Sequence, residues 1–132
     1  MTSHLHAVPD SVWGPHRTPA TRVIIESPFA ENPSAPDRAH LAYARRCLRD
    51  SLLLAEAPFA PHLLYPQVLD DDAPFQRAIG LQRAFRWYGV ADLCAVYTDL
   101  GISGGMRQGI EYATKIGLPI EERSLNDDRE PR

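Results

Sequence analysis

The sequence has few cysteines, no long apolar run and no excess of positive charge. The two cysteines, Cys47 and Cys94, lie far apart and form no CxxC pair, so both are expected to be free, buried thiols. No apolar run approaches the roughly 20 residues that a membrane span needs. The N-terminal residues contain no apolar segment typical of a signal peptide. These absences predict a cytoplasmic protein that does not associate with a membrane.

The charge and the missing motifs exclude several functional classes. A formal net charge of −3 at pH 7 gives no basic excess to hold a nucleic acid polymer. A small nucleotide stays possible, because one phosphate needs only local donors. The histidines form no HxxxH or His/Cys cluster, so neither a metal site nor another cofactor is expected. The GxGxxG and Walker motifs are also absent.

The length and composition predict one globular domain. The chain has 132 residues, of which 44% are hydrophobic and 23% are charged. Residues 1–21 and 126–132 are polar and are predicted to be flexible tails. The domain is therefore predicted to cover residues 22–125.

Short apolar segments alternate with helical patterns along this domain. The first helical pattern follows a Ser34 N-cap and has an apolar stripe that includes Leu41, Ala44, Leu48 and Leu52. The second begins after an Asp72 cap and runs to about Tyr88, and the third covers about residues 105–116. Strands are predicted over residues 22–26, 59–65, 92–97 and 119–123.

This alternation of strands and helices is typical of an α/β fold. It predicts a four- or five-stranded, mainly parallel sheet with helices on both faces. Ligands of such sheets bind beyond the carboxyl ends of the strands. Two loops are expected to meet there, SPFAENP at residues 27–33 and TDLGISGG at residues 98–105.

The loop after the first strand carries three candidate substrate-binding residues, Ser27, Pro28 and Phe29. The serine can donate a hydrogen bond to a sugar or a phosphate, and the phenylalanine can flank a base. The alternative is a capped loop whose phenylalanine belongs to the core.

The loop before the third helix supplies the candidates Ser103, Gly104, Gly105 and Met106. The first N–H groups of a helix have no partner within the helix and can bind an anion. The alternative is a flexible turn in which Ser103 is only the N-cap of the helix.

Two carboxylates are candidates for catalysis. Asp99, just past the third strand, can orient a hydroxyl or act as an acid, or it can instead bind the N–H groups of its own turn. Glu111 lies on the third helix, about 200° around the helix axis from the inward Ala113, which favours a solvent-facing side chain.

The order of these motifs carries a resemblance to a known family. An SPF-type loop after the first strand, a crossover helix, and then LCAVY, TDLGISGGM and GLPI occur over about residues 22–125. This pattern resembles the nucleoside 2-deoxyribosyltransferase-like family, which includes the 2′-deoxynucleoside 5′-monophosphate N-glycosidases and phage and bacterial domains of unknown function. The resemblance implies a three-layer flavodoxin-like or Rossmann-like domain and a homodimer or higher homo-oligomer. It also implies cleavage or transfer of the bond between a nucleobase and deoxyribose.

The resemblance fails at one position. In that family a glutamate on the helix after the glycine loop attacks the anomeric carbon and forms a covalent glycosyl-enzyme. The matching residue in this chain is Gly109, which has no nucleophile and leaves an open space. Glu111 comes two residues later, so the helical period rotates it away from the cleft.

Three hypotheses follow from the missing glutamate. The chain is an N-glycosidase or deoxyribosyltransferase in which Asp99 or Glu111 supplies the carboxylate. Alternatively, it is a non-catalytic module that binds or senses a nucleoside or nucleotide through Ser27, Ser103 and the amides of Gly104 and Gly105. The third hypothesis is an interaction or scaffold protein whose loops hold no ligand.

Overall fold

The fold was analysed in a computed structural model that describes residues 20–29, 38–70 and 73–125. Its centre is a sheet of four parallel strands in the order β2-β1-β3-β4. The strands are β1 (Arg22–Glu26), β2 (Ala57–Phe59), β3 (Leu93–Tyr97) and β4 (Ile120–Arg123). The parallel sheet predicted from the sequence is therefore confirmed. Both predicted tails lie almost entirely outside the described residues.

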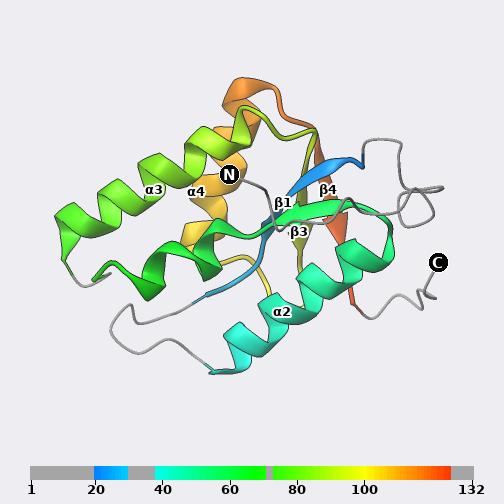
Figure 1. Cartoon of the computed structure of the whole chain (residues 1–132), viewed down its shortest axis with the longest axis horizontal. Helices are drawn as coiled ribbons and strands as arrows, with labels where there is room; N and C mark the ends of the chain where they lie inside the picture. Colours follow the sequence, from blue (N-terminus) through cyan, green and yellow to red (C-terminus); the bar gives the residue numbers. More distant parts are fainter. Residues whose placement is uncertain (1–19, 30–37, 71–72, 126–132) are drawn as a thin grey trace, which may run out of the picture.

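Helices cover both faces of the sheet, as predicted, and the three layers form a Rossmann-like α/β fold (Figure 1). The helix α2 (Arg38–Leu53) lies on one face. The helices α3 (Pro74–Tyr88) and α4 (Gly104–Ile116) lie on the other. Within the part of the chain that the structure describes, no helix is long and apolar enough to cross a membrane.

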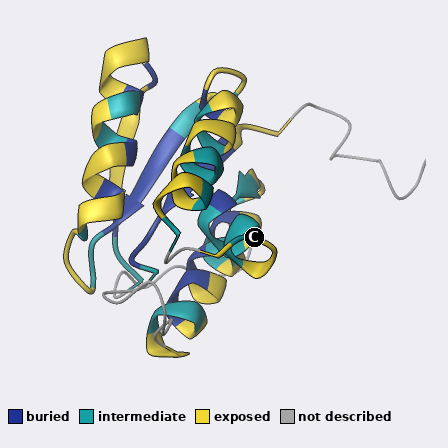
Figure 2. Cartoon of the chain, turned by 90° about the vertical axis from the view of Figure 1, so that its left-hand side faces the viewer, coloured by how far each residue is buried: buried dark blue, intermediate teal, exposed yellow. Residues whose placement is uncertain are grey.

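The two central strands divide their side chains between these two layers. Figure 2 shows that buried residues gather in the central strands and on the inner sides of the helices, and four of the five residues in each of the central strands β1 and β3 are buried. Such strands are apolar on both faces because helices cover both. By the alternation of a strand, Glu26 shares a face with Ile24, which packs against the layer of α3 and α4. The residues that face α2 are Val23, Ile25, Ala95 and Tyr97, and those that face α3 and α4 are Ile24, Cys94 and Val96.

The predicted second strand over residues 59–65 is wrong. The strand β2 ends at Phe59 and lies at the edge of the sheet. The chain then forms two short 3-10 helices, η2 (Pro61–Leu63) and η3 (Tyr65–Gln67), each with a proline in its first turn. Proline has no N–H to donate to a sheet, which explains why the strand stops before residue 61. His62 therefore lies in a turn near the end of β1.

The inward face of α2 agrees only in part with the predicted stripe. Ala44 is buried and Leu48 packs against the core as predicted, but Leu52 is 60% exposed. Tyr43, Cys47 and Ser51 are buried as well. The polar groups of this face are satisfied, since the Tyr43 hydroxyl donates to Asp99 and the Ser51 hydroxyl donates to Glu56. A hydropathy pattern cannot indicate which face of α2 is buried, because it assigns polar residues to the solvent side even where they are buried. The predicted N-cap Ser34 lies outside the described residues.

The ends of the other two helices are defined by local sequence. Ser103 is the N-cap of α4, and its hydroxyl accepts a hydrogen bond of 3.2 Å from the Met106 amide. Gly117 ends α4 in the left-handed conformation with a φ of 77°. The N-cap of α3 is Ala73, which makes no side-chain capping bond, and the predicted cap Asp72 lies outside the described residues.

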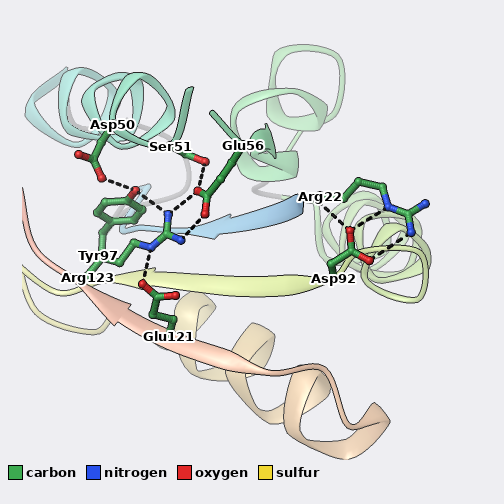
Figure 3. Close-up of polar contacts among 8 residues, drawn as sticks. All are labelled: Arg22, Asp50, Ser51, Glu56, Asp92, Tyr97, Glu121 and Arg123. Atoms are coloured by element: carbon green, nitrogen blue, oxygen red, sulfur yellow. Dashed lines mark hydrogen bonds and ion pairs between the residues drawn. The ribbon is translucent and has the colours of Figure 1, made fainter. Parts of the chain in front are cut away.

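A buried ion pair joins the C-terminal end of β4 to the segment before β2 (Figure 3). Two guanidinium nitrogens of Arg123 bond to the two carboxylate oxygens of Glu56, each at 2.7 Å. The Arg123 side chain is only 2% exposed. Nε of Arg123 also bonds to Glu121 at 3.1 Å. This bidentate pair fixes strands at opposite edges of the sheet relative to each other.

Candidate functional site

A cavity opens beyond the carboxyl end of β1, between the η2–η3 segment, α3 and the start of α4. Its volume is about 150 Å³. One buried water needs roughly 10–15 Å³ by this kind of measure, so the cavity has room for a small organic ligand. Its position at the end of a parallel strand is where the topology favours ligand binding.

The buried carboxylate of this cavity belongs to Glu26, the last residue of β1. Glu26 is 6% exposed, and its Oε1 accepts a short hydrogen bond from the Tyr88 hydroxyl at the end of α3. Burial raises the pKa of Glu26 to about 7, and the Tyr88 hydrogen bond opposes part of this rise. The carboxyl group thus exists in both protonation states near neutral pH, which suits acid–base or nucleophilic chemistry.

The carboxylate of Glu26 lies directly against the backbone of Gly109 on α4. A Cβ atom at position 109 would stand 2.6 Å from Cδ and 2.8 Å from Oε2 of Glu26. Real Cβ atoms do not approach other atoms so closely. The open space that Gly109 leaves is therefore filled by a carboxylate that comes from β1.

A second polar pair lines the cavity next to Glu26. Oγ of Ser27 and Nε2 of His62 lie 2.8 Å apart and share a hydrogen bond whose direction depends on the histidine tautomer. Burial lowers the pKa of His62 to about 4, so its ring is neutral at pH 7. The Phe29 ring meets the His62 ring edge-on, with 6.3 Å between centroids. The end of β1 and the turn η2 together present a hydroxyl, an imidazole and an aromatic ring.

The opposite side of the cavity is formed by one face of α3. Positions 77, 81, 84 and 88 line the cavity and follow the spacing of a single helix face. Tyr65 of η3 lies along this helix, because its Cβ is close to Gly80 and its hydroxyl accepts a 2.9 Å hydrogen bond from Nε1 of Trp87. Tyr65 lines the cavity as well, so an aromatic ring is available beside the α3 face.

The structure brings together most of the predicted binding residues. The two predicted loops do meet at this cavity. Pro28 is buried but does not line the cavity, and Gly104 is exposed outside it. The predicted residues that do line it are Ser27, Phe29, Ser103, Gly105 and Met106.

The two predicted catalytic carboxylates lie elsewhere. Asp99 is on the α2 side, where it accepts hydrogen bonds from the Tyr43 hydroxyl at 2.5 Å and from the Leu125 amide at 2.9 Å. Asp99 thus ties α2 and the segment after β4 together, whereas the alternative predicted from the sequence was that it binds the N–H groups of its own turn. Glu111 is exposed on α4 and borders a shallow depression that shares Leu81 and Phe85 with the cavity. Neither carboxylate lines the cavity at Glu26.

Comparison with known proteins gives a family without an assigned activity. A family model described as a domain of unknown function, DUF7768, matches residues 21–123. The chain belongs to this family. The match extends from β1 to β4, so the DUF7768 domain includes every element that lines the cavity. Neither the search of curated proteins nor the search of solved structures found a match.

The cavity residues that sequence reasoning missed include the four that bear most on its chemistry, Glu26, His62, Arg77 and Tyr88. One signal for Glu26 was present, because in the segment RVIIE a carboxylate directly follows three apolar residues of a buried strand. His62 was assigned to a strand that does not form. Arg77 and Tyr88 share a face of α3 that the apolar pattern of that helix did not indicate.

Proposed function

We propose that this DUF7768 domain binds a nucleoside or nucleotide in the cavity at the end of β1 and cleaves or transfers the bond between base and deoxyribose. Glu26 is the reactive carboxylate in this proposal. The observation that carries it is the buried carboxylate of Glu26 in the cavity, in the space beside Gly109. The family resemblance expects a glutamate at position 109, and Glu26 supplies the same functional group from β1.

The chemistry of the bond explains why such a carboxylate matters. Cleavage of a glycosidic bond develops positive charge on the sugar, and a carboxylate can stabilise this charge or form a covalent intermediate. In the proposed first step an ionised oxygen of Glu26 bonds to the anomeric carbon. The base leaves with the electron pair of the C–N bond and takes a proton from water. In the second step water attacks the anomeric carbon, which releases the sugar and restores the carboxylate.

The other lining groups suit the two halves of a nucleoside. Phe29, Tyr65 and Phe85 offer ring faces or edges for a base. The hydroxyl of Ser27 and the amide of Gly105 are polar groups for the sugar. An apolar cavity with few converging polar groups is typical of small-molecule sites.

Binding without catalysis is the second candidate function. The hydrogen bond from Tyr88 favours it, because this bond already uses Oε1 of Glu26 and holds the carboxylate in place. A ligand would then be recognised by the same residues but not cut. The absence of a carboxylate at position 109 is in keeping with this candidate as well.

One experiment separates the two candidates. The purified protein is incubated with the four common 2′-deoxynucleosides and their 5′-monophosphates, and free base is measured by chromatography. Thermal shift is recorded on the same set, since a ligand that binds only the folded state raises the melting temperature. Base release supports the enzyme, and a thermal shift without base release supports the binding module. If no compound gives either signal, the proposed function is wrong.

A further inference from the structure

One lining residue of the cavity carries a permanent positive charge. Among the described residues that line the cavity, Arg77 is the single lysine or arginine and Glu26 is the single carboxylate. His62 is neutral at pH 7, because its burial lowers its pKa to about 4. The proposed reactive centre does not use Arg77, so a cation in this cavity calls for a role.

Arg77 lies far from Glu26 along α3. The Tyr88 hydroxyl contacts Glu26, and Arg77 precedes Tyr88 by eleven residues on the same helix. Three turns of α-helix correspond to about 16 Å along the axis. Eleven residues also bring the helix back to nearly the same face, so both side chains border the same cavity. The cavity therefore has a carboxylate near one end of α3 and a guanidinium near the other.

The surface between these two charges is mainly apolar. Leu69, Gly80, Leu81 and Ala84 line this part. These four residues carry no charge, so none of them pairs with Arg77, which is exposed to solvent at this part of the cavity. The carboxylate of Glu26 repels a negative group placed next to it, and Arg77 attracts such a group to the distant end. A ligand that fits both ends is neutral near Glu26 and anionic near Arg77.

We propose that Arg77 binds the phosphate chain of a nucleotide and makes this cavity selective for nucleotides over neutral nucleosides. This inference rests on the proposed function and names its substrate class. A guanidinium suits this role because its planar donors match phosphate oxygens bidentately. The three helical turns between the two charges favour a ligand with more than one phosphate, which reaches further from the sugar than a monophosphate does.

The test measures affinity by calorimetry for 2′-deoxynucleosides and for their 5′-mono-, di- and triphosphates. The wild-type protein should bind the di- and triphosphates more tightly than the neutral nucleosides. Arg77→Gln should weaken the binding of these phosphates by about 10- to 100-fold, the usual effect of losing a charged hydrogen bond. It should leave the affinity for neutral nucleosides unchanged. Arg77→Lys should retain part of the affinity, because the charge remains.

A matched control is available on the same helix. Arg83 is exposed on another face of α3 and does not line the cavity, so Arg83→Gln removes the same charge without touching the ligand. Equal phosphate affinities in Arg77→Gln and Arg83→Gln would overturn the inference. So would tighter binding of neutral nucleosides than of nucleotides. If neither class binds and no base is released, the proposed function itself has failed, and the two failures are thereby distinguished.

Discussion

The carboxylate of Glu26 occupies the space that a side chain at Gly109 would need. A Cβ at position 109 would lie 2.6 Å from Cδ of Glu26, which is well inside van der Waals contact. One residue belongs to the first strand of the sheet and the other to the last helix. The Glu26 carboxylate therefore depends on the space that the glycine at position 109 of α4 leaves open. The proposed function and several of the predictions below depend on this contact.

Gly109→Ala should destabilise the protein by about 1–3 kcal/mol, the usual cost of overpacking a filled core position. The loss should appear even though alanine is the better helix former by about 1 kcal/mol. Urea denaturation measures it. Gly104→Ala is the control, because a Cβ at position 104 meets no atom within 4 Å. If both substitutions have the same effect on stability, the contact between Glu26 and Gly109 is not as tight as described.

Glu26→Gln should remove a pH dependence of stability. The pKa of Glu26 is raised to about 7 in the folded protein from an ordinary value of 4.5. The folded state thus binds the proton more tightly than the unfolded state between these two pH values. The contribution of Glu26 to stability is fully present below about pH 4.5 and is lost as pH rises to about 7, by roughly 3 kcal/mol.

The measurement is the difference in unfolding free energy between wild type and Glu26→Gln at a series of pH values from 4.5 to 8. His62 has the opposite effect, because its lowered pKa makes stability rise between about pH 4 and pH 6.5. Both proteins contain His62, so its effect cancels in the difference. A difference that stays constant across this range would show that Glu26 titrates normally.

Tyr88→Phe should cost about 1–3 kcal/mol of stability, because a buried carboxylate oxygen loses its donor. It should also raise the pKa of Glu26 further, since the Tyr88 hydrogen bond lowers that pKa. NMR titration of the Glu26 carboxyl carbon reports the second effect. Tyr112→Phe is the control, because the Tyr112 ring stacks on Phe85 at 4.4 Å between centroids and that contact needs no hydroxyl. Equal losses in both variants would mean that the hydroxyl of Tyr88 contributes nothing specific.

Arg123→Ala should destabilise the protein by about 3–5 kcal/mol, because the largely buried Glu56 carboxylate loses its counter-charge, although it keeps the hydrogen bond from Ser51. The comparison is Arg22→Ala, which removes an ion pair with Asp92 whose side chains are 62% and 44% exposed. Exposed pairs contribute about 0–1 kcal/mol. Chemical denaturation of both variants tests this contrast, which Figure 3 lets the reader follow. Similar losses in the two variants would contradict it.

The sheet could be predicted from the sequence because its central strands are short, apolar and separated by clear helix signals. β1, β3 and β4 were placed to within a residue. β2 was misplaced, because the run FAPHLLY is as apolar as a strand while Pro61 and Pro66 turn the backbone into 3-10 helices. The buried face of α2 was predicted only in part, because Tyr43 and Ser51 are core residues whose polar groups are satisfied by hydrogen bonds.

The candidate site was predicted in position but not in chemistry. The place of the two loops followed from the topology rule for parallel sheets, and five of the seven residues predicted to bind a ligand line the cavity. Glu26 was not singled out, because a glutamate at the end of a strand usually has its carboxylate in solvent. Only the contact with Gly109 and the Tyr88 hydroxyl shows that this one is held inside. Such contacts join residues more than 60 positions apart, and local patterns do not contain them.

The release of free base by wild type, Glu26→Gln, Glu111→Gln and Asp99→Asn tests the central claim most directly. The substrates are 2′-deoxynucleosides and their 5′-phosphates, at one pH and with thermal melts to verify folding. The proposed role of Glu26 predicts that Glu26→Gln lowers the rate by at least about 100-fold, whereas Glu111→Gln, which does not line the cavity, stays near wild type. Asp99→Asn should also stay near wild type if it folds. Base release that survives in Glu26→Gln and is lost in Glu111→Gln or a folded Asp99→Asn would contradict the assignment of Glu26.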